Sequence, residues 1–249
     1  MLSKFGLSGG SLKWLYSYLS DRLLSVRIKG NLSDPFVATS GVPQGSHLGP
    51  LLFILSINDV SSGLTFCSIL IFANDIKIFS RIKCYYDQIC LQRDLDRIYL
   101  WACTNKLKLN INKCNILSIL RARSDRLVFN YSLNNEVLEA VDNIKDLRVI
   151  YQSNFEFDIH VKTVTAKANK LLGFVKRSTE EIKSYLSQVQ LYKSIVRPVL
   201  LYGSIIWSPA KVVLTDELEN VQHKFFKYAA FKMGKPMNYA NYDYSSITQ

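Results

Sequence analysis

The sequence predicts an α+β fold, with an antiparallel sheet and helices in residues 1–153 and a mainly helical region in residues 154–249. Up to about residue 150, short stretches alternate apolar and polar residues and are bounded by Gly, Asn or Asp, which indicates strands joined by turns. After about residue 155 the apolar residues recur every three or four positions, as in amphipathic helices. With 249 residues, 48% of them hydrophobic and 20% charged, the chain has a globular composition, and we expect two closely packed domains.

The first region is expected to begin with a helix and a strand pair. Apolar residues of the segment 11–19 fall on one helical face, and Ser8 or Ser11 would cap that helix. Residues 23–30 then alternate like a strand, and residues 35–39 return after a turn at Gly30 and Asn31.

A loop and an apolar helix follow. Residues 40–46, SGVPQGS, read as a loop, because Gly41 and Gly45 permit close backbone approach and Pro43 stiffens the chain. Gln44 adds both a hydrogen-bond donor and an acceptor. The helix over about 48–57 carries leucine, isoleucine and phenylalanine around much of its surface, so we expect it to be buried.

The stretch IFANDIKIF, residues 71–79, predicts a β-hairpin. An apolar run ends at Phe72, polar Asn74 and Asp75 form the turn, and Ile76, Ile78 and Phe79 make the return. The tip of this hairpin would therefore present one amide and one carboxylate.

A surface helix is expected next, over about residues 85–107. Apolar residues recur on one side of it, while Asp94 and Arg97 belong to the charged, solvent-facing side. Residues 106–114 and 116–120 alternate like strands, and a further strand pair spans about residues 126–150.

The second region combines helical spacing with positive charge. Between Asp158 and Arg197 there are eight basic residues against three acidic ones. A last helix is expected to start at Asp216, with help from Glu219 at its cap.

The net charge, the apolar runs and the cysteine and histidine content restrict the class of partner and the cellular compartment. The formal net charge of +11 favours a polyanionic partner, nucleic acid first and an anionic membrane surface second. No run reaches the roughly 20 apolar residues of a spanning helix, so we expect no membrane insertion. Five cysteines without a Cys-x-x-Cys pair argue against a disulfide framework and a zinc ribbon, and three dispersed histidines show no metal-ligand spacing. These features predict an intracellular protein, nuclear or cytoplasmic and not secreted, whose oligomeric state stays open.

Three stretches, taken in order, resemble the reverse transcriptase of non-LTR (LINE-type) retrotransposons, of the jockey-like kind. They are SGVPQGSHLGPLLFILSINDV at 40–60, LIFANDIKIF at 70–79, and the pattern W-x3-N-x-L-x-L-N-x2-K-C at 101–114. NIKDLRVI at 143–150 resembles the strand pair that grips the primer. LYKSIVRPVLLYGSIIWSP at 191–209 and LENVQHKFFKY at 218–228 resemble the thumb and the segment beyond it. The resemblance covers nearly the whole chain.

The resemblance implies a fold and a reaction. Residues 1–153 would be the C-terminal part of a polymerase palm, and residues 154–249 the thumb and connection segment. The reaction would be RNA-templated addition of deoxynucleotides to a DNA 3′ end, with Mg²⁺ as cofactor and an RNA template and a DNA primer as partners.

The resemblance also implies roles for particular residues. Asp75 would bind metal beside Asn74, and Lys113 would act on the departing pyrophosphate. Nucleotide and template would contact Gly41, Pro43, Gln44, Gly45, Phe72 and Ala73, and nucleic acid would contact Lys162, Lys167, Lys170, Lys176 and Arg177. Each role has a purely structural alternative. Residues 40–46 would be a connecting loop, Lys113 would be a solvated lysine, and the basic residues would form the solvent-exposed face of amphipathic helices.

Two departures from the family pattern concern the metal site. Asn74 stands where the family carries the leading aspartate of a pair, and a further aspartate lies in the family on an earlier strand, ahead of the helix at 11–19. Two Mg²⁺ ions about 4 Å apart repel by roughly 16 kcal/mol at an effective dielectric of 20, and a neutral amide does not offset that repulsion. Arg148 and Leu201, where the family usually has glycine and often glutamate, are further departures.

We therefore expect a truncated reverse transcriptase that is catalytically inactive, through truncation and through Asn74. The alternatives are a non-catalytic remnant that still binds nucleic acid, and an inert or interacting fragment.

Overall fold

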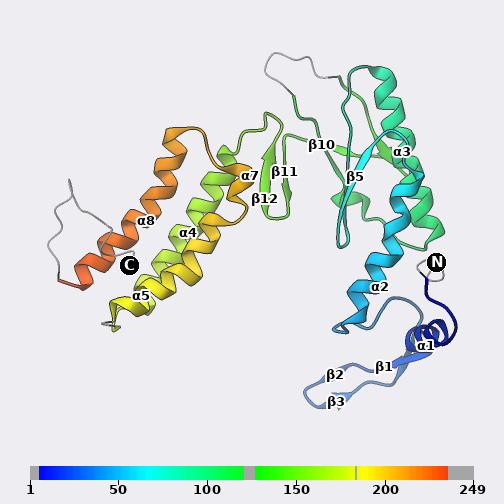
Figure 1. Cartoon of the computed structure of the whole chain (residues 1–249), viewed down its shortest axis with the longest axis horizontal. Helices are drawn as coiled ribbons and strands as arrows, with labels where there is room; N and C mark the ends of the chain where they lie inside the picture. The colour runs from blue at the N-terminus through cyan, green and yellow to red at the C-terminus, as the bar shows by residue number, and fades with distance from the viewer. Residues whose placement is uncertain (1–5, 121–126, 183, 235–249) are drawn as a thin grey trace. The chain divides into compact units, whose positions relative to one another are not determined.

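The computed structural model describes residues 6–120, 127–182 and 184–234, which form two compact units (Figure 1). We call residues 6–113 with 127–138 the hairpin unit, and the described part of residues 114–120 with 139–234 the helical unit. The boundary expected at residue 153 stays a prediction. The last 15 residues of the predicted second region, 235–249, and residue 183 lie outside the described part of the chain.

The hairpin unit combines short antiparallel strand pairs with two helices of ten residues and one of twenty. Its elements are α1 (Gly10–Leu19), β1 (Arg22–Leu24), β2 (Arg27–Ile28), β3 (Asn31–Leu32), β4 (Phe36–Ala38), α2 (Leu48–Ile57), the 3-10 helix η2 (Asn58–Gly63), β5 (Ser68–Phe72), β6 (Asp75–Phe79), α3 (Tyr85–Thr104), the 3-10 turn η3 (Ile111–Lys113), β8 (Ser132–Leu133) and β9 (Glu136–Val137). The antiparallel pairs are β1 with β4, β2 with β3, β5 with β6, and β8 with β9.

The helical unit begins with strands and ends in long helices. Its elements are β7 (Asn115–Leu117), β10 (Glu139–Val141), β11 (Asn143–Asp146), β12 (Val149–Gln152), α4 (Asp158–Ser178), α5 (Tyr185–Leu191), the π-helical turn η4 (Tyr192–Val196), α6 (Arg197–Leu201), α7 (Ser204–Trp207) and α8 (Val212–Lys232). Strand β7 pairs in parallel with β10, and β11 pairs antiparallel with β12.

The mixture of helices and small sheets confirms the α+β class, and the antiparallel sheet needs a correction. Every sheet among the described residues has two strands, so the strands form separate pairs rather than one sheet. The pairing of β7 with β10 is parallel, which the alternation of residue types did not indicate. The strand pair expected over 126–150 is in fact divided among β8 with β9, β10, and β11 with β12, while residue 126 lies outside the described residues.

The expected turn at Gly30 and Asn31 lies one residue earlier. Lys29 and Gly30 both have positive φ, 48° and 90°, and Ile28 pairs with Asn31. Two consecutive positive φ values are typical of the two-residue turns that match strand twist.

The predicted strand at 106–114 is wrong, because helix α3 ends in a hydrogen-bonded C-terminal cap and the 3-10 turn η3 follows it. Lys106 has φ 55°, its N–H bonds the Cys103 carbonyl at 3.1 Å, and the Leu107 N–H bonds the Ala102 carbonyl at 2.8 Å. This pairing satisfies the last carbonyls of α3 and turns the chain away from an extended path.

Two helices differ from their predicted boundaries or burial. Helix α8 starts at Val212, after Lys211, four residues before the expected cap at Asp216. Helix α2 buries Leu52 but leaves Leu51 and Ile54 exposed at 52% and 53%. The expectation that this helix is buried is therefore wrong for the side that carries Leu51 and Ile54.

Each unit has its own apolar core. In the hairpin unit, Ile57, Val60 and Ile98 are buried under the apolar side chains of β5 and β6. In the helical unit, one cluster joins α4, η4 and α8 and includes Leu172, Val196 and Phe225. Within the described residues, no helix has the length and apolar character needed to cross a membrane.

Candidate active site

The β5–β6 hairpin has one packed and one open face. Ile69 pairs with Ile78, Ile71 pairs with Ile76, and all four side chains pack against the core under α3. The alternate residues of β5 and β6 face away, and Phe72 is 61% exposed. Because successive side chains of a strand point to opposite faces, one face of the hairpin packs on the core and the other face is open to solvent.

The tip of this hairpin consists of Ala73 and Asn74, which corrects the expected turn at Asn74 and Asp75. Phe72 pairs with Asp75 across the two-residue loop, so Asp75 is the first residue of β6. Ala73 has φ 51°, in the left-handed region that favours glycine, at a cost of order 1–3 kcal/mol. Asn74 and Asp75 are both exposed at this end of the hairpin.

The polar groups of the tip do not fit a pair of Mg²⁺ ions. Asp75 supplies a carboxylate and Asn74 supplies a neutral amide, whereas two divalent ions need several negative ligands between them. In the part of the chain that the structure describes, no three His, Cys, Asp or Glu side chains gather as a metal site would require.

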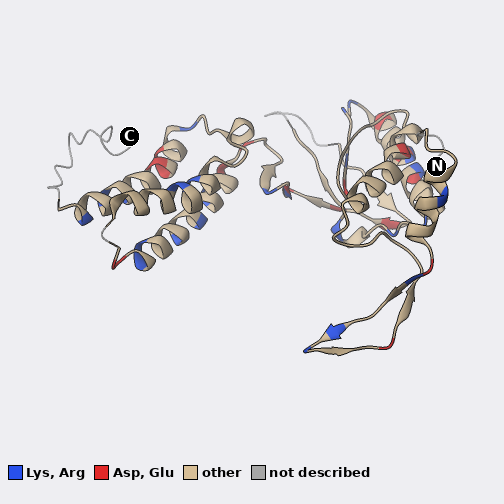
Figure 2. Ribbon diagram, turned by 60° about the horizontal axis from the view of Figure 1, so that its bottom comes forward, with Lys and Arg blue, Asp and Glu red and all other residues tan. Residues whose placement is uncertain are grey.

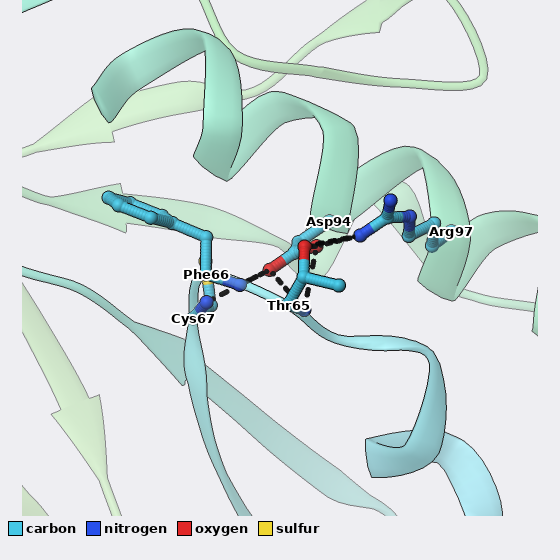
Figure 3. A network of polar contacts seen from close by, with 5 residues as sticks. All are labelled: Thr65, Phe66, Cys67, Asp94 and Arg97. Carbon is cyan, nitrogen blue, oxygen red and sulfur yellow. Dashed lines mark hydrogen bonds and ion pairs between the residues drawn. The ribbon is translucent and has the colours of Figure 1, made fainter. Parts of the chain in front are cut away.

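A buried carboxylate fixes the start of strand β5. Asp94 of α3 is 0% exposed and accepts hydrogen bonds from the backbone N–H groups of Thr65, Phe66 and Cys67, at 3.2, 2.8 and 2.9 Å (Figure 3). Arg97 pairs with the same carboxylate at 2.8 Å. The expectation that Asp94 faces solvent is therefore wrong: it ties the strand that leads to the tip onto helix α3.

The protonation of Asp94 follows from these contacts. Burial by itself would raise the pKa of this carboxyl, but the N–H groups of Cys67, Phe66 and Thr65 and the guanidinium of Arg97 hold the pKa at about 2. Asp94 is thus ionised at neutral pH. Burial, together with the neighbouring Asp94 charge, raises the pKa of the Cys67 thiol to about 12, which keeps that thiol protonated.

The loop at 40–46 is held from both sides. Arg22 Nη2 donates to the carbonyls of Ser40 and Gly41, at 3.0 and 2.7 Å. Ser46 Oγ donates to the Pro43 carbonyl at 2.7 Å and accepts from the N–H of Gly49 at 3.0 Å.

The glycines of this loop have the expected conformations. Gly41 and Gly45 have φ 79° and 81°, and the space around them is open. Gln44 is exposed, whereas Pro43 is half-buried. A side chain at the buried Gly49 would lie 3.0 Å from Ser46 Oγ, a close approach that sequence reasoning missed.

Lys113 is not joined to the hairpin tip by a hydrogen bond or ion pair. It ends η3, its side chain is exposed, and its N–H bonds the Asn110 carbonyl at 3.0 Å. Its role at a departing pyrophosphate stays a prediction.

The five predicted nucleic-acid contacts all lie on α4, in the helical unit. Lys162, Lys167, Lys170 and Arg177 are exposed, whereas Lys176 is half-buried, with its Nζ 5.4 Å from the centroid of the Tyr228 ring on α8. Figure 2 shows that Lys and Arg recur along the long helices of this unit. Lys176 therefore differs from the other four residues, because its side chain is half-buried against α8.

Comparison with known proteins gives one family. The sequence profile described as "Reverse transcriptase (RNA-dependent DNA polymerase)" matches residues 2–176. Among curated proteins, the "RNA-directed DNA polymerase from mobile element jockey" of Drosophila funebris is 27% identical over 236 residues, which cover 89% of this chain and 25% of that protein. The probable RNA-directed DNA polymerases from transposon BS and transposon X-element of Drosophila melanogaster are 26% and 27% identical, each over 84% of this chain and 24% of the relative. The chain thus spans about a quarter of the length of these relatives. No solved structure shows a significant match.

Proposed function

The chain belongs to the reverse transcriptase family, and from this premise we propose that it binds template and primer without polymerising. Its relatives are polymerases of non-LTR mobile elements. We further propose that residues 1–153 derive from the palm and that residues 154–249 derive from the thumb and connection.

Asn74 at the tip of the β5–β6 hairpin carries this proposal. The hairpin has a regular register, one packed face and an exposed end, which supports its assignment as the scaffold of the site. The chemistry differs, because an amide stands beside Asp75 where the resemblance implies a second carboxylate. Phosphoryl transfer by this family depends on metal ions that neutralise phosphate charge and align the attacking hydroxyl, and one carboxylate does not hold such a pair.

The basic face of α4 supports nucleic-acid binding. Lys162, Lys170 and Arg177 fall within one third of the helical circumference, on the side away from buried Ala168 and Val175, because 3.6 residues make one turn. An exposed row of cations of this kind attracts phosphates without reading their sequence.

We expect weak, sequence-independent binding to single-stranded RNA and DNA that falls about 100-fold between 50 and 200 mM salt. The reason is counterion release: about five phosphate contacts give a slope of log K against log salt of roughly −3.5. Fluorescence anisotropy of labelled oligonucleotides of two unrelated sequences measures both properties.

The double variant Lys162→Gln with Lys170→Gln is expected to make this slope shallower by about 1.4. A matched control, Lys29→Gln with Lys108→Gln, removes two exposed lysines of the hairpin unit. Affinity that persists at 200 mM salt, or a slope that only the control alters, would refute a phosphate contact through α4.

A further inference from the structure

Arg22 joins the end of helix α1 to the start of the loop at 40–46. Its Nε donates to the carbonyl of Leu19, the last residue of α1, at 3.1 Å. Its Nη2 donates to the carbonyls of Ser40 and Gly41, at 3.0 and 2.7 Å. Arg22 pairs with Ala38 across β1 and β4, so the strand pairing brings the loop back to the guanidinium. One half-buried side chain therefore holds three carbonyls from two segments of the hairpin unit.

The loop that Arg22 holds would be loose without such contacts. Gly41 and Gly45 are exposed and have φ 79° and 81°, and glycine loses more conformational freedom on ordering than other residues. A ligand that must order a loose loop binds more weakly than one that meets a loop already in its bound conformation. Ser46 Oγ fixes the far end of the loop through the Pro43 carbonyl, and Arg22 fixes the near end. The two contacts together preorganise the exposed residues between them.

The hold of Arg22 on the loop depends on the shape of its guanidinium group. Both loop carbonyls accept from the same nitrogen, Nη2, while Nε in the same plane bonds the end of α1. A planar guanidinium fixes the directions of these donors, whereas a lysine ammonium is a point charge on a flexible stem. Arg22→Lys therefore keeps the positive charge and loses the geometry of the three hydrogen bonds.

We propose that Arg22 is a positioning residue, which holds the loop at 40–46 in the conformation that contacts the template strand. The template as the ligand of this loop rests on the proposed function, whereas the hold on the loop rests on the three hydrogen bonds of Arg22. Exposed Gln44, in the middle of the loop, carries an amide that both donates and accepts, as a contact with a nucleotide requires. Because Arg22 acts through backbone carbonyls, this contact depends on the arrangement of its donors rather than on its charge.

Photo-cross-linking from the loop to a primed RNA template tests this role. A photoreactive residue replaces Gln44 in the full chain, and the yield of cross-linked template strand is measured. Arg22→Lys is expected to lower this yield about 5- to 10-fold while the affinity for the template changes less than about twofold, because the charge is kept and α4 contacts phosphates elsewhere. The matched control is Arg27→Lys, at an exposed arginine of β2 in the same unit, which should change the yield less than about twofold.

Amide hydrogen exchange distinguishes a released loop from a general loss of stability. Arg22→Lys should speed exchange within residues 40–46 about 5-fold or more and leave exchange in β5 and β6 unchanged, because local opening involves only the segment that has lost its contacts. Equally faster exchange in both segments would show that Arg22 supports the whole hairpin unit, and would refute a positioning role.

The outcomes separate the role of Arg22 from the proposed function. If the chain binds the template and Arg22→Lys cross-links as well as Arg27→Lys does, the positioning role is refuted while the proposed function stands. The same conclusion follows if the bound chain forms no cross-link from the loop. If the chain does not bind the template, both are refuted.

Discussion

Replacing Asp94 with asparagine is expected to lower the free energy of unfolding of the hairpin unit by about 3 kcal/mol, because several N–H groups lose a charged acceptor inside the protein. The carboxylate accepts from three consecutive backbone N–H groups and pairs with Arg97. An amide offers one oxygen and turns an NH₂ donor toward groups that are themselves donors. We expect the loss to be concentrated at Thr65–Cys67 and along β5.

Asp96→Asn is the matched control, since Asp96 lies on the same helix, is exposed, and accepts one hydrogen bond from Gln92 at 2.8 Å. It should cost no more than about 0.5 kcal/mol. Thermal unfolding followed by circular dichroism, with amide hydrogen exchange of residues 65–72, measures both variants. Equal stability of the two variants would show that the Asp94 network does not hold β5.

The same network predicts a loss of stability in acid. The folded-state pKa of Asp94 is lowered from 3.8 to about 2, so its contribution is present above pH 4 and is lost as pH falls from about 4 to 2. The contribution is about 2 kcal/mol by proton linkage. In Asp94→Asn this part of the pH dependence should be absent, and unfolding curves measured between pH 2 and 5 test it.

Replacing Trp207 with alanine is expected to destabilise the helical unit by about 3–5 kcal/mol, because a large buried side chain leaves a cavity. Trp207 is 1% exposed and packs with Val149, Val161 and Leu214. Its Nε1 donates to the Tyr202 carbonyl at 2.7 Å, and its ring lies 5.0 Å from the ring of His160.

Ile205→Ala is the control, because Ile205 lies in the same helix and is 99% exposed. It should change stability by less than about 0.5 kcal/mol. The histidine gives a second measurement: burial lowers the pKa of His160, and opening its environment in Trp207→Ala should raise that pKa toward 6.5, as followed by NMR titration. A Trp207→Ala variant as stable as Ile205→Ala would contradict the packing of α7 against β12 and α4.

Much of the secondary structure could be predicted from local patterns. The alternation that ends at Phe72 and resumes at Ile76 specifies both strands and their packed face, because strand periodicity depends on neighbouring residues alone. The exact turn was missed since polar residues suggested Asn74 and Asp75, while the residue with positive φ is Ala73, whose side chain carries no turn signal.

Contacts between segments that are distant in sequence could not be predicted from such local patterns. In the sequence, Asp94 resembles a surface residue beside Arg97. Its partners are main-chain N–H groups more than 25 positions earlier, and residue types do not predict contacts of the main chain. Likewise Lys224 bonds Asn169, and Lys176 lies over the Tyr228 ring, only because α8 packs against α4. The family resemblance indicated the β5–β6 hairpin as the expected active site, but it did not reveal either of these contacts.

The proposed absence of polymerisation depends on a β5–β6 tip that does not hold a pair of metal ions, and Mg²⁺-dependent incorporation of labelled deoxynucleotide on a primed RNA template tests this proposal. The natural chain, Asn74→Asp, and Asn74→Asp with Asp75→Ala as background are compared. Asn74→Asp should strengthen local Mg²⁺ binding yet give no incorporation above the background. The family pattern has a third aspartate on an earlier strand, ahead of the helix at 11–19, so two adjacent carboxylates alone are not expected to align the attacking hydroxyl and the phosphate. Incorporation by the natural chain, or by Asn74→Asp above the background, would contradict the proposed absence of polymerisation.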